Sequence, residues 1–150
     1  MEWAHAIYLD RCCLQRPLDD QTQPRIRVET EAVLAILAAV QVGDLSLLNS
    51  EALEYEISRT PNEARRTEVS AVLALADERV EITDEVQVLA ETLERLGVQS
   101  MDAVHLALAV VGTADFFATC DDDILSRREK LPTRICKIIS LPELVFEVTK

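Results

Sequence analysis

Four acidic residues stand where the carboxylates of a folded chain can be brought together around a divalent cation: Asp10, Glu56, Asp102 and Asp121. Asp10 and Asp121 each follow a short apolar run that is typical of a strand buried on both faces. Asp102 lies in the first turn of an apolar helical segment, and Glu56 lies in another helical segment. Because ligands bind beyond the carboxyl ends of parallel strands, these side chains can converge. Mg²⁺ or Mn²⁺ would relieve their mutual repulsion, polarise a phosphodiester and activate a water to attack it.

Each of these acids also has an ordinary structural explanation when it is considered alone. Asp10 could begin a turn or cap the following helix, and Asp121 could cap a helix or belong to a solvated acidic turn. Asp102 could be a favourable charge at the positive end of a helix dipole. Glu56 could be an exposed helical acid, with two further glutamates of the same segment as rivals for its role. The metal site is therefore predicted from the joint pattern of the four residues.

The elements that must position these acids alternate regularly along the chain. We expect strands and helices at the following residues: strands at 4–9, 45–49, 80–82, 115–119 and 135–139, and helices at 24–42, 51–57, 61–75, 85–96, 101–111, around 125–128 and at 141–147. No two strands are joined by a hairpin turn, so the alternation predicts a parallel sheet with helices on both faces. The fold class is therefore α/β, and the length of 150 residues fits a single domain over residues 1–150.

The net charge restricts how the chain can contact nucleic acid. Twenty-seven acids against 15 bases give a net charge of -12, which argues against a general nucleic-acid binder driven by its own charge. It does not exclude an enzyme that holds a phosphodiester through bound divalent cations, because the ions supply the positive charge. No apolar run reaches membrane-spanning length and the start of the chain lacks the features of a signal peptide, so we expect a cytoplasmic protein with no membrane partner.

The cysteines and histidines do not form a zinc motif in the sequence. The four cysteines include no CxxC pair, and only two histidines are present, so we expect a reduced compartment and no structural zinc site. Cys12 and Cys13 are interpreted as small core residues. His105 falls one helical turn after Asp102 and could contact the acidic site, although a buried, hydrogen-bonded core histidine is the simpler interpretation.

Four segments, in their order and spacing, resemble the PIN domain family: "IYLD", "NSEALEYEIS", "SMDAVHLALA" and "ADFFATCDDDIL". The segment "YLDRCCLQRPLDDQTQPRIRVETEAV" is similar to stand-alone, VapC-like bacterial members. The resemblance implies a three-layer α/β/α sandwich with a central parallel sheet and a ribonuclease that depends on Mg²⁺ or Mn²⁺. It also implies the toxin of a toxin–antitoxin pair, often a homodimer, which is silenced by an antitoxin protein.

The resemblance also assigns roles to individual residues of this chain. The family's four acids match Asp10, Glu56, Asp102 and Asp121, with the three aspartates as metal ligands and Glu56 as a ligand or as the group that orients the attacking water. Two further residues match supporting positions, namely the hydroxyl of Thr119 and the carboxylate of Asp123.

One position departs from the family pattern and keeps a second function open. The family usually has Thr or Ser directly after the first aspartate, whereas this chain has Arg11. Its cation could pair with Asp10 and compete with the metal, or it could point outward to a substrate phosphate. The alternative to a ribonuclease is therefore a catalytically impaired PIN-fold interaction or scaffold protein. A response-regulator-like domain is less favoured, because Lys137 lies within a predicted strand instead of at its end.

Overall fold

The computed structural model describes residues 4–149, and in this range short strands alternate with helices. The elements follow one another in this order: β1 (His5–Leu9), α1 (Arg11–Gln15), the 3-10 turn η1 (Arg16–Leu18), α2 (Pro24–Gln41), β2 (Leu45–Ser50), α3 (Glu51–Ser58), α4 (Glu63–Leu73), β3 (Glu78–Val80), α5 (Asp84–Arg95), α6 (Ser100–Val111), β4 (Phe116–Ala118), α7 (Asp122–Arg127), the 3-10 turn η2 (Arg128–Lys130), β5 (Lys137–Ile139) and α8 (Leu141–Val148).

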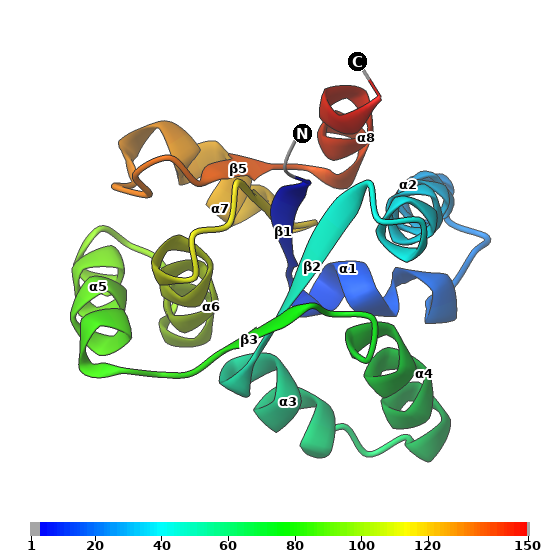
Figure 1. Cartoon of the computed structure of the whole chain (residues 1–150), viewed down its shortest axis with the longest axis horizontal. Coiled ribbons are helices and arrows are strands. Elements are labelled where there is room, and N and C mark those ends of the chain that lie inside the picture. Colours follow the sequence, from blue (N-terminus) through cyan, green and yellow to red (C-terminus); the bar gives the residue numbers. More distant parts are fainter. Residues whose placement is uncertain (1–3, 150) are drawn as a thin grey trace.

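The strands form one sheet of five parallel strands in the order β3-β2-β1-β4-β5 (Figure 1). β1 lies at its centre, and Ile7, Tyr8 and Leu9 of this strand have no exposed surface. An apolar run with no polar alternation is the pattern of a strand covered on both faces, and this is the position that β1 occupies.

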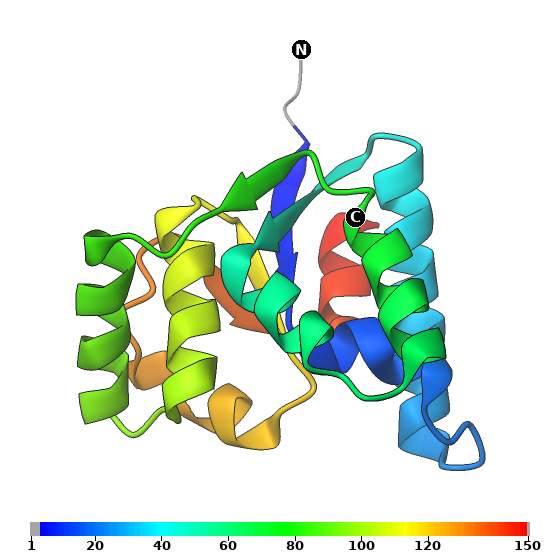
Figure 2. The same ribbon diagram turned by 90° about the horizontal axis from the view of Figure 1, so that it is seen from below.

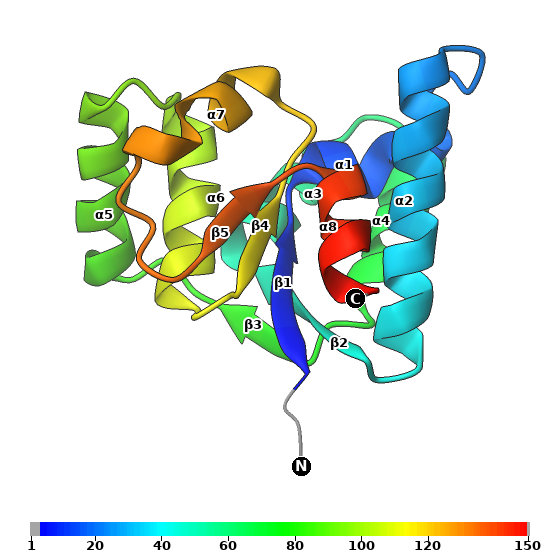
Figure 3. The same ribbon diagram turned by 90° about the horizontal axis from the view of Figure 1, so that it is seen from above.

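Helices cover both faces of the sheet. On one face α2 packs against α8, and on the other α5 packs along α6, which also contacts β2 and β4 (Figure 1). Figure 3 shows the sheet between these two groups of helices. The predicted fold class, a three-layer α/β/α sandwich with a central parallel sheet, is therefore confirmed.

The order of the strands creates a natural binding position at one end of β1. The chain passes from β1 to β2 in one direction across the sheet, and β4 and β5 lie in the other direction. The strand order therefore reverses between β1 and β4, whose last residues Leu9 and Ala118 are paired. Ligands in open parallel sheets bind in the crevice outside the carboxyl ends at such a switch point.

Several element boundaries differ by one or two residues from those predicted, and two of them are instructive. The third strand covers residues 78–80 instead of 80–82, because its position is set by pairing with β2, in which Leu48 aligns with Glu78. Helix α6 begins at Ser100, so Gln99 is its N-cap, and no side chain caps this end. The predicted start of this helix at residue 101 was therefore late by one residue.

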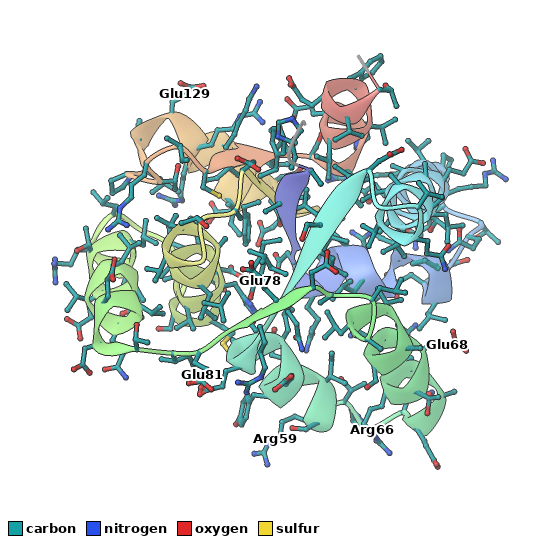
Figure 4. All side chains as sticks on the ribbon, in the orientation of Figure 1. Arg59, Arg66, Glu68, Glu78, Glu81 and Glu129 are labelled. Atoms are coloured by element: carbon teal, nitrogen blue, oxygen red, sulfur yellow. The ribbon has the colours of Figure 1, made fainter. Side chains whose placement is uncertain are left out.

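The surface of the molecule carries its excess of acidic residues. Figure 4 labels Glu68, Glu81 and Glu129 toward the outline of the molecule and Glu78 near the middle of the view, and all four are exposed. Within residues 4–149, no helix combines the length and the apolar character needed to cross a bilayer. With a net charge of -12, the surface as a whole repels polyanions.

Candidate metal centre

A pocket of about 330 Å³ opens at the carboxyl end of β1. It is lined by Asp10, Arg11, Cys12, Arg16, Glu56, Asp102, His105, Cys120 and Asp121. Figure 2 shows how the elements gather here, with the starts of α1, α6 and α7 at the same end of β1. All four acids singled out in the sequence therefore reach one pocket, although each comes from a different segment. Their role as metal ligands stays a prediction.

Asp10 is the most buried of these acids, with 6% of its surface exposed. It caps α1, where one carboxylate oxygen accepts a hydrogen bond from the Arg11 amide at 2.8 Å. The other oxygen accepts from the Thr119 hydroxyl at 3.0 Å. Burial raises the pKa of Asp10 to about 7, although these hydrogen bonds and the nearby His105 favour the charged form. A bound cation would remove this obstacle to ionisation.

Asp102 and Asp121 are placed by the starts of two helices. Asp102 lies in the first turn of α6, and Asp121 is the N-cap of α7, where its side chain accepts from the Asp123 amide at 2.8 Å. Burial, reinforced by the charges of Asp10 and Asp121, raises the pKa of Asp102 to about 6. Asp121 therefore caps α7 and Asp102 lies at the positive end of the α6 dipole, and both side chains also line the pocket.

Glu56 reaches the pocket from α3 and is held there by His105, which contacts its Oε1 through Nε2. The Arg11 guanidinium lies 3.8 Å from Oε2 of Glu56. Burial disfavours the charged form of Glu56, but the hydrogen bond and charge of His105, together with Arg11, outweigh it and lower the pKa. Glu56 is therefore ionised at neutral pH.

His105 belongs to a buried chain of hydrogen bonds behind the pocket. Its Nδ1 lies 2.6 Å from the hydroxyl of Tyr8, which lies 2.7 Å from the hydroxyl of Ser50. Ser50 in turn accepts from the Leu53 amide at 3.1 Å, which caps α3. The interpretation of His105 as a buried, hydrogen-bonded core residue agrees with this structure, and the residue also lines the pocket and positions Glu56.

The two arginines of the pocket are held by acids. Arg11 pairs with Glu56 and not with Asp10, whose only contact with this residue is through the backbone amide. Arg16 bridges Asp19 at 3.0 Å and Glu29 at 2.9 Å. Arg16 was missed in the sequence. The signal that could have found it is Glu29, an acid at one of the buried positions of α2, which are otherwise apolar except for Thr30.

The two predicted supporting residues have different surroundings. Thr119 is fully buried, and its hydroxyl joins two acids by donating to Asp10 and accepting from the Asp121 amide at 3.1 Å. Asp123 is exposed, pairs with Arg127 at 3.2 Å and is not part of the pocket lining. Neither residue lines the pocket, but Thr119 bonds to two of the acids that do, whereas the side chain of Asp123 pairs with Arg127.

The donor set fits a hydrated hard cation. Among the described residues, the sulfurs of Cys12, Cys13 and Cys120 lie within 4.8 Å of one another, and no carboxylate belongs to a group of three ligand atoms that is as close. The carboxylates are therefore spread more widely around the pocket. Mg²⁺ is usually bound by one or two carboxylates and retains several waters, which suits such spacing. Burial disfavours the charged forms of Asp10 and Asp102, and the charges of Asp10 and Asp121 add to this effect at Asp102, so a cation in the pocket would favour ionisation of both.

In sequence, no protein-family model and no curated protein matches this chain. Among solved structures, a chain in the crystal structure of VapBC2 from Rickettsia felis, bound to a DNA fragment from their promoter, is similar to it with a TM-score of 0.59. The alignment covers 89% of this chain and 98% of that chain at 12% sequence identity. At this identity the likeness is one of fold, and we conclude that this chain folds like a chain of the VapBC2 complex.

Proposed function

We propose that this protein is a divalent-metal-dependent endoribonuclease of the PIN type, which hydrolyses phosphodiester bonds of RNA. The observation that carries this proposal is the convergence of Asp10, Glu56, Asp102 and Asp121 in one pocket at the switch point of the sheet. Four acids from separate segments require a counterion to be ionised together, and hard divalent cations prefer oxygen ligands.

The biological setting is proposed from the family resemblance of the sequence. The motifs are similar to those of stand-alone, VapC-like PIN proteins, and the fold is like that of a chain in the VapBC2 complex. We therefore propose that the protein is the toxin of a toxin–antitoxin pair in the cytoplasm, that it forms a homodimer and that an antitoxin protein silences it.

The proposed chemistry assigns a task to each group in the pocket. Asp10, Asp102 and Asp121 would hold Mg²⁺ or Mn²⁺, which when bound supplies charge that polarises the phosphodiester and activates water. Glu56 is ionised and fixed by His105, so it can orient the attacking water as a hydrogen-bond acceptor. Attack of water at phosphorus with departure of the 3′ oxygen leaves a 5′-phosphate and a 3′-hydroxyl.

RNA cleavage in the presence of Mn²⁺ tests the proposal. Asp121→Asn is expected to lower the cleavage rate at least 100-fold, because it removes a charged ligand while the Asn side chain can still cap α7. The matched control is Glu68→Gln, which removes one charge from the exposed surface of α4 and should cleave like wild type. Equal rates in all three proteins would end the ribonuclease proposal.

A second candidate function, an interaction scaffold that does not cleave RNA, is favoured by Arg11. Its guanidinium faces Glu56 at 3.8 Å and adds a positive charge to the wall of the pocket, which opposes cation binding. A scaffold of this kind would show no stabilisation by Mn²⁺.

Arg11→Thr separates the two candidates. We expect Mn²⁺ to bind this variant three- to tenfold more tightly than wild type, because one positive charge leaves the pocket wall. The measurement is the rise in melting temperature over a Mn²⁺ series, since a ligand at about 100 times its Kd stabilises the native state by about 2.7 kcal/mol. A shift in the variant but none in wild type favours the scaffold, and equal shifts show that Arg11 does not hinder the ion.

A further inference from the structure

Three of the four cysteines lie together at the edge of the pocket, although the sequence separates them widely. Cys12 and Cys13 belong to α1 directly after β1, and Cys120 follows the neighbouring strand β4. The sulfur atoms of Cys12, Cys13 and Cys120, which we term the sulfur cluster, lie within 4.8 Å of one another. The proposed hydrolysis uses none of these thiols, so the sulfur cluster needs a separate explanation.

The spacing of the sulfurs suits a single thiophilic ion. Sulfurs that bind one tetrahedral Zn²⁺ at about 2.3 Å lie about 3.8 Å apart. The sulfurs of Cys13 and Cys120 are separated by 3.7 Å, which already matches this value. Cys12 is the half-buried member, so its side chain has the most room to adjust.

The surroundings of the sulfur cluster favour a bound ion with one open side. The Cys120 amide donates to the Cys12 sulfur at 3.3 Å, a contact that stabilises negative charge on sulfur. Cys13 is fully buried behind the cluster, whereas Cys12 and Cys120 line the pocket and give an ion a route of entry. An Asp10 oxygen lies 3.6 Å from the Cys12 sulfur, so the sulfur cluster borders the acidic pocket.

We propose that Cys12, Cys13 and Cys120 bind Zn²⁺ through three thiolates, with the fourth position facing the acidic pocket. Thiolates select soft or borderline ions, whereas the carboxylates opposite select hard ions such as Mg²⁺ and Mn²⁺. The two sites are thus adjacent but chemically distinct, and the sulfur site exists whether or not the protein cleaves RNA. From the sequence we expected no structural zinc site because no CxxC motif is present, whereas the ligands proposed here come from the segments that follow β1 and β4.

Co²⁺ and Zn²⁺ titrations of the reduced, metal-free protein test this site. Wild type should bind one Co²⁺ with the near-ultraviolet sulfur-to-metal charge-transfer band and the intense visible bands of a tetrahedral thiolate site, and one equivalent of Zn²⁺ should remove them. Competition with a chromophoric chelator should show Zn²⁺ binding at least 100-fold more weakly in Cys12→Ser and Cys120→Ser, because each loses a thiolate ligand.

The fourth cysteine supplies the matched control. Cys136 is buried outside the sulfur cluster, so Cys136→Ser should keep both the spectrum and the Zn²⁺ affinity of wild type. Independently of any variant, Zn²⁺ should slow alkylation of Cys12 by iodoacetamide in wild type at least tenfold. Absence of the charge-transfer band in wild type, its persistence in Cys120→Ser, or unchanged alkylation of Cys12 would each overturn the proposal.

Discussion

Asp10→Asn is expected to abolish RNA cleavage and at the same time to stabilise the metal-free protein by about 2–4 kcal/mol at pH 8. The folded-state pKa of Asp10 is raised to about 7, against about 4 for an unfolded chain. Between these values the native state binds more protons than the unfolded state, so wild-type stability falls as the pH rises from about 4 to about 7. Asn is neutral at every pH and does not lose this stability.

The measurement is urea unfolding in EDTA at pH 5 and pH 8, both above the isoelectric point of about 4.5. The advantage of Asp10→Asn should be largest at pH 8 and smaller at pH 5, where wild-type Asp10 is protonated in the native state. Mn²⁺ should raise the stability of wild type at pH 8 and leave the variant unchanged. An advantage of equal size at both pH values would show that the burial of Asp10 does not act through its charge.

His105→Leu is expected to lower the free energy of unfolding by about 2–4 kcal/mol, with loss of cleavage in the folded fraction. The imidazole is 1% exposed and bonds to both Tyr8 and Glu56. Leucine fills a similar volume but makes neither bond, so Glu56 keeps a half-buried charge with only Arg11 near it. Urea unfolding and the cleavage rate with Mn²⁺ measure the two effects.

Two controls separate the hydrogen-bond network from general packing. His5→Leu, at the exposed start of β1, should stay within about 0.5 kcal/mol of wild type. Tyr8→Phe loses the bonds to His105 and Ser50 but keeps the stacking on Phe117, so its effect should be near 1 kcal/mol. Wild-type stability in His105→Leu would show that the network does not support the fold.

The sequence by itself determined the fold class and the identity of the four acids. The run 4–9 is apolar without alternation because β1 is covered on both faces, and this local composition is readable without coordinates. The alternation of strands and helices implied a parallel sheet, in which the residues after β1 and β4 could meet, and the strand order of the structure makes β1 and β4 neighbours. The exact bounds of the short edge strand β3 could not be predicted from the sequence, because pairing with β2 sets the position of β3.

Only the tertiary structure decided which side chains pair inside the pocket. Arg11 could have met Asp10 or a phosphate, and the fold instead turns it toward Glu56. His105 reaches Glu56, and the sulfurs of Cys12, Cys13 and Cys120 meet, because β1, β4, α3 and α6 end or begin at one place. The contacts between these segments join residues 45 to 108 positions apart, and the local sequence pattern carries no information on side-chain direction over that separation.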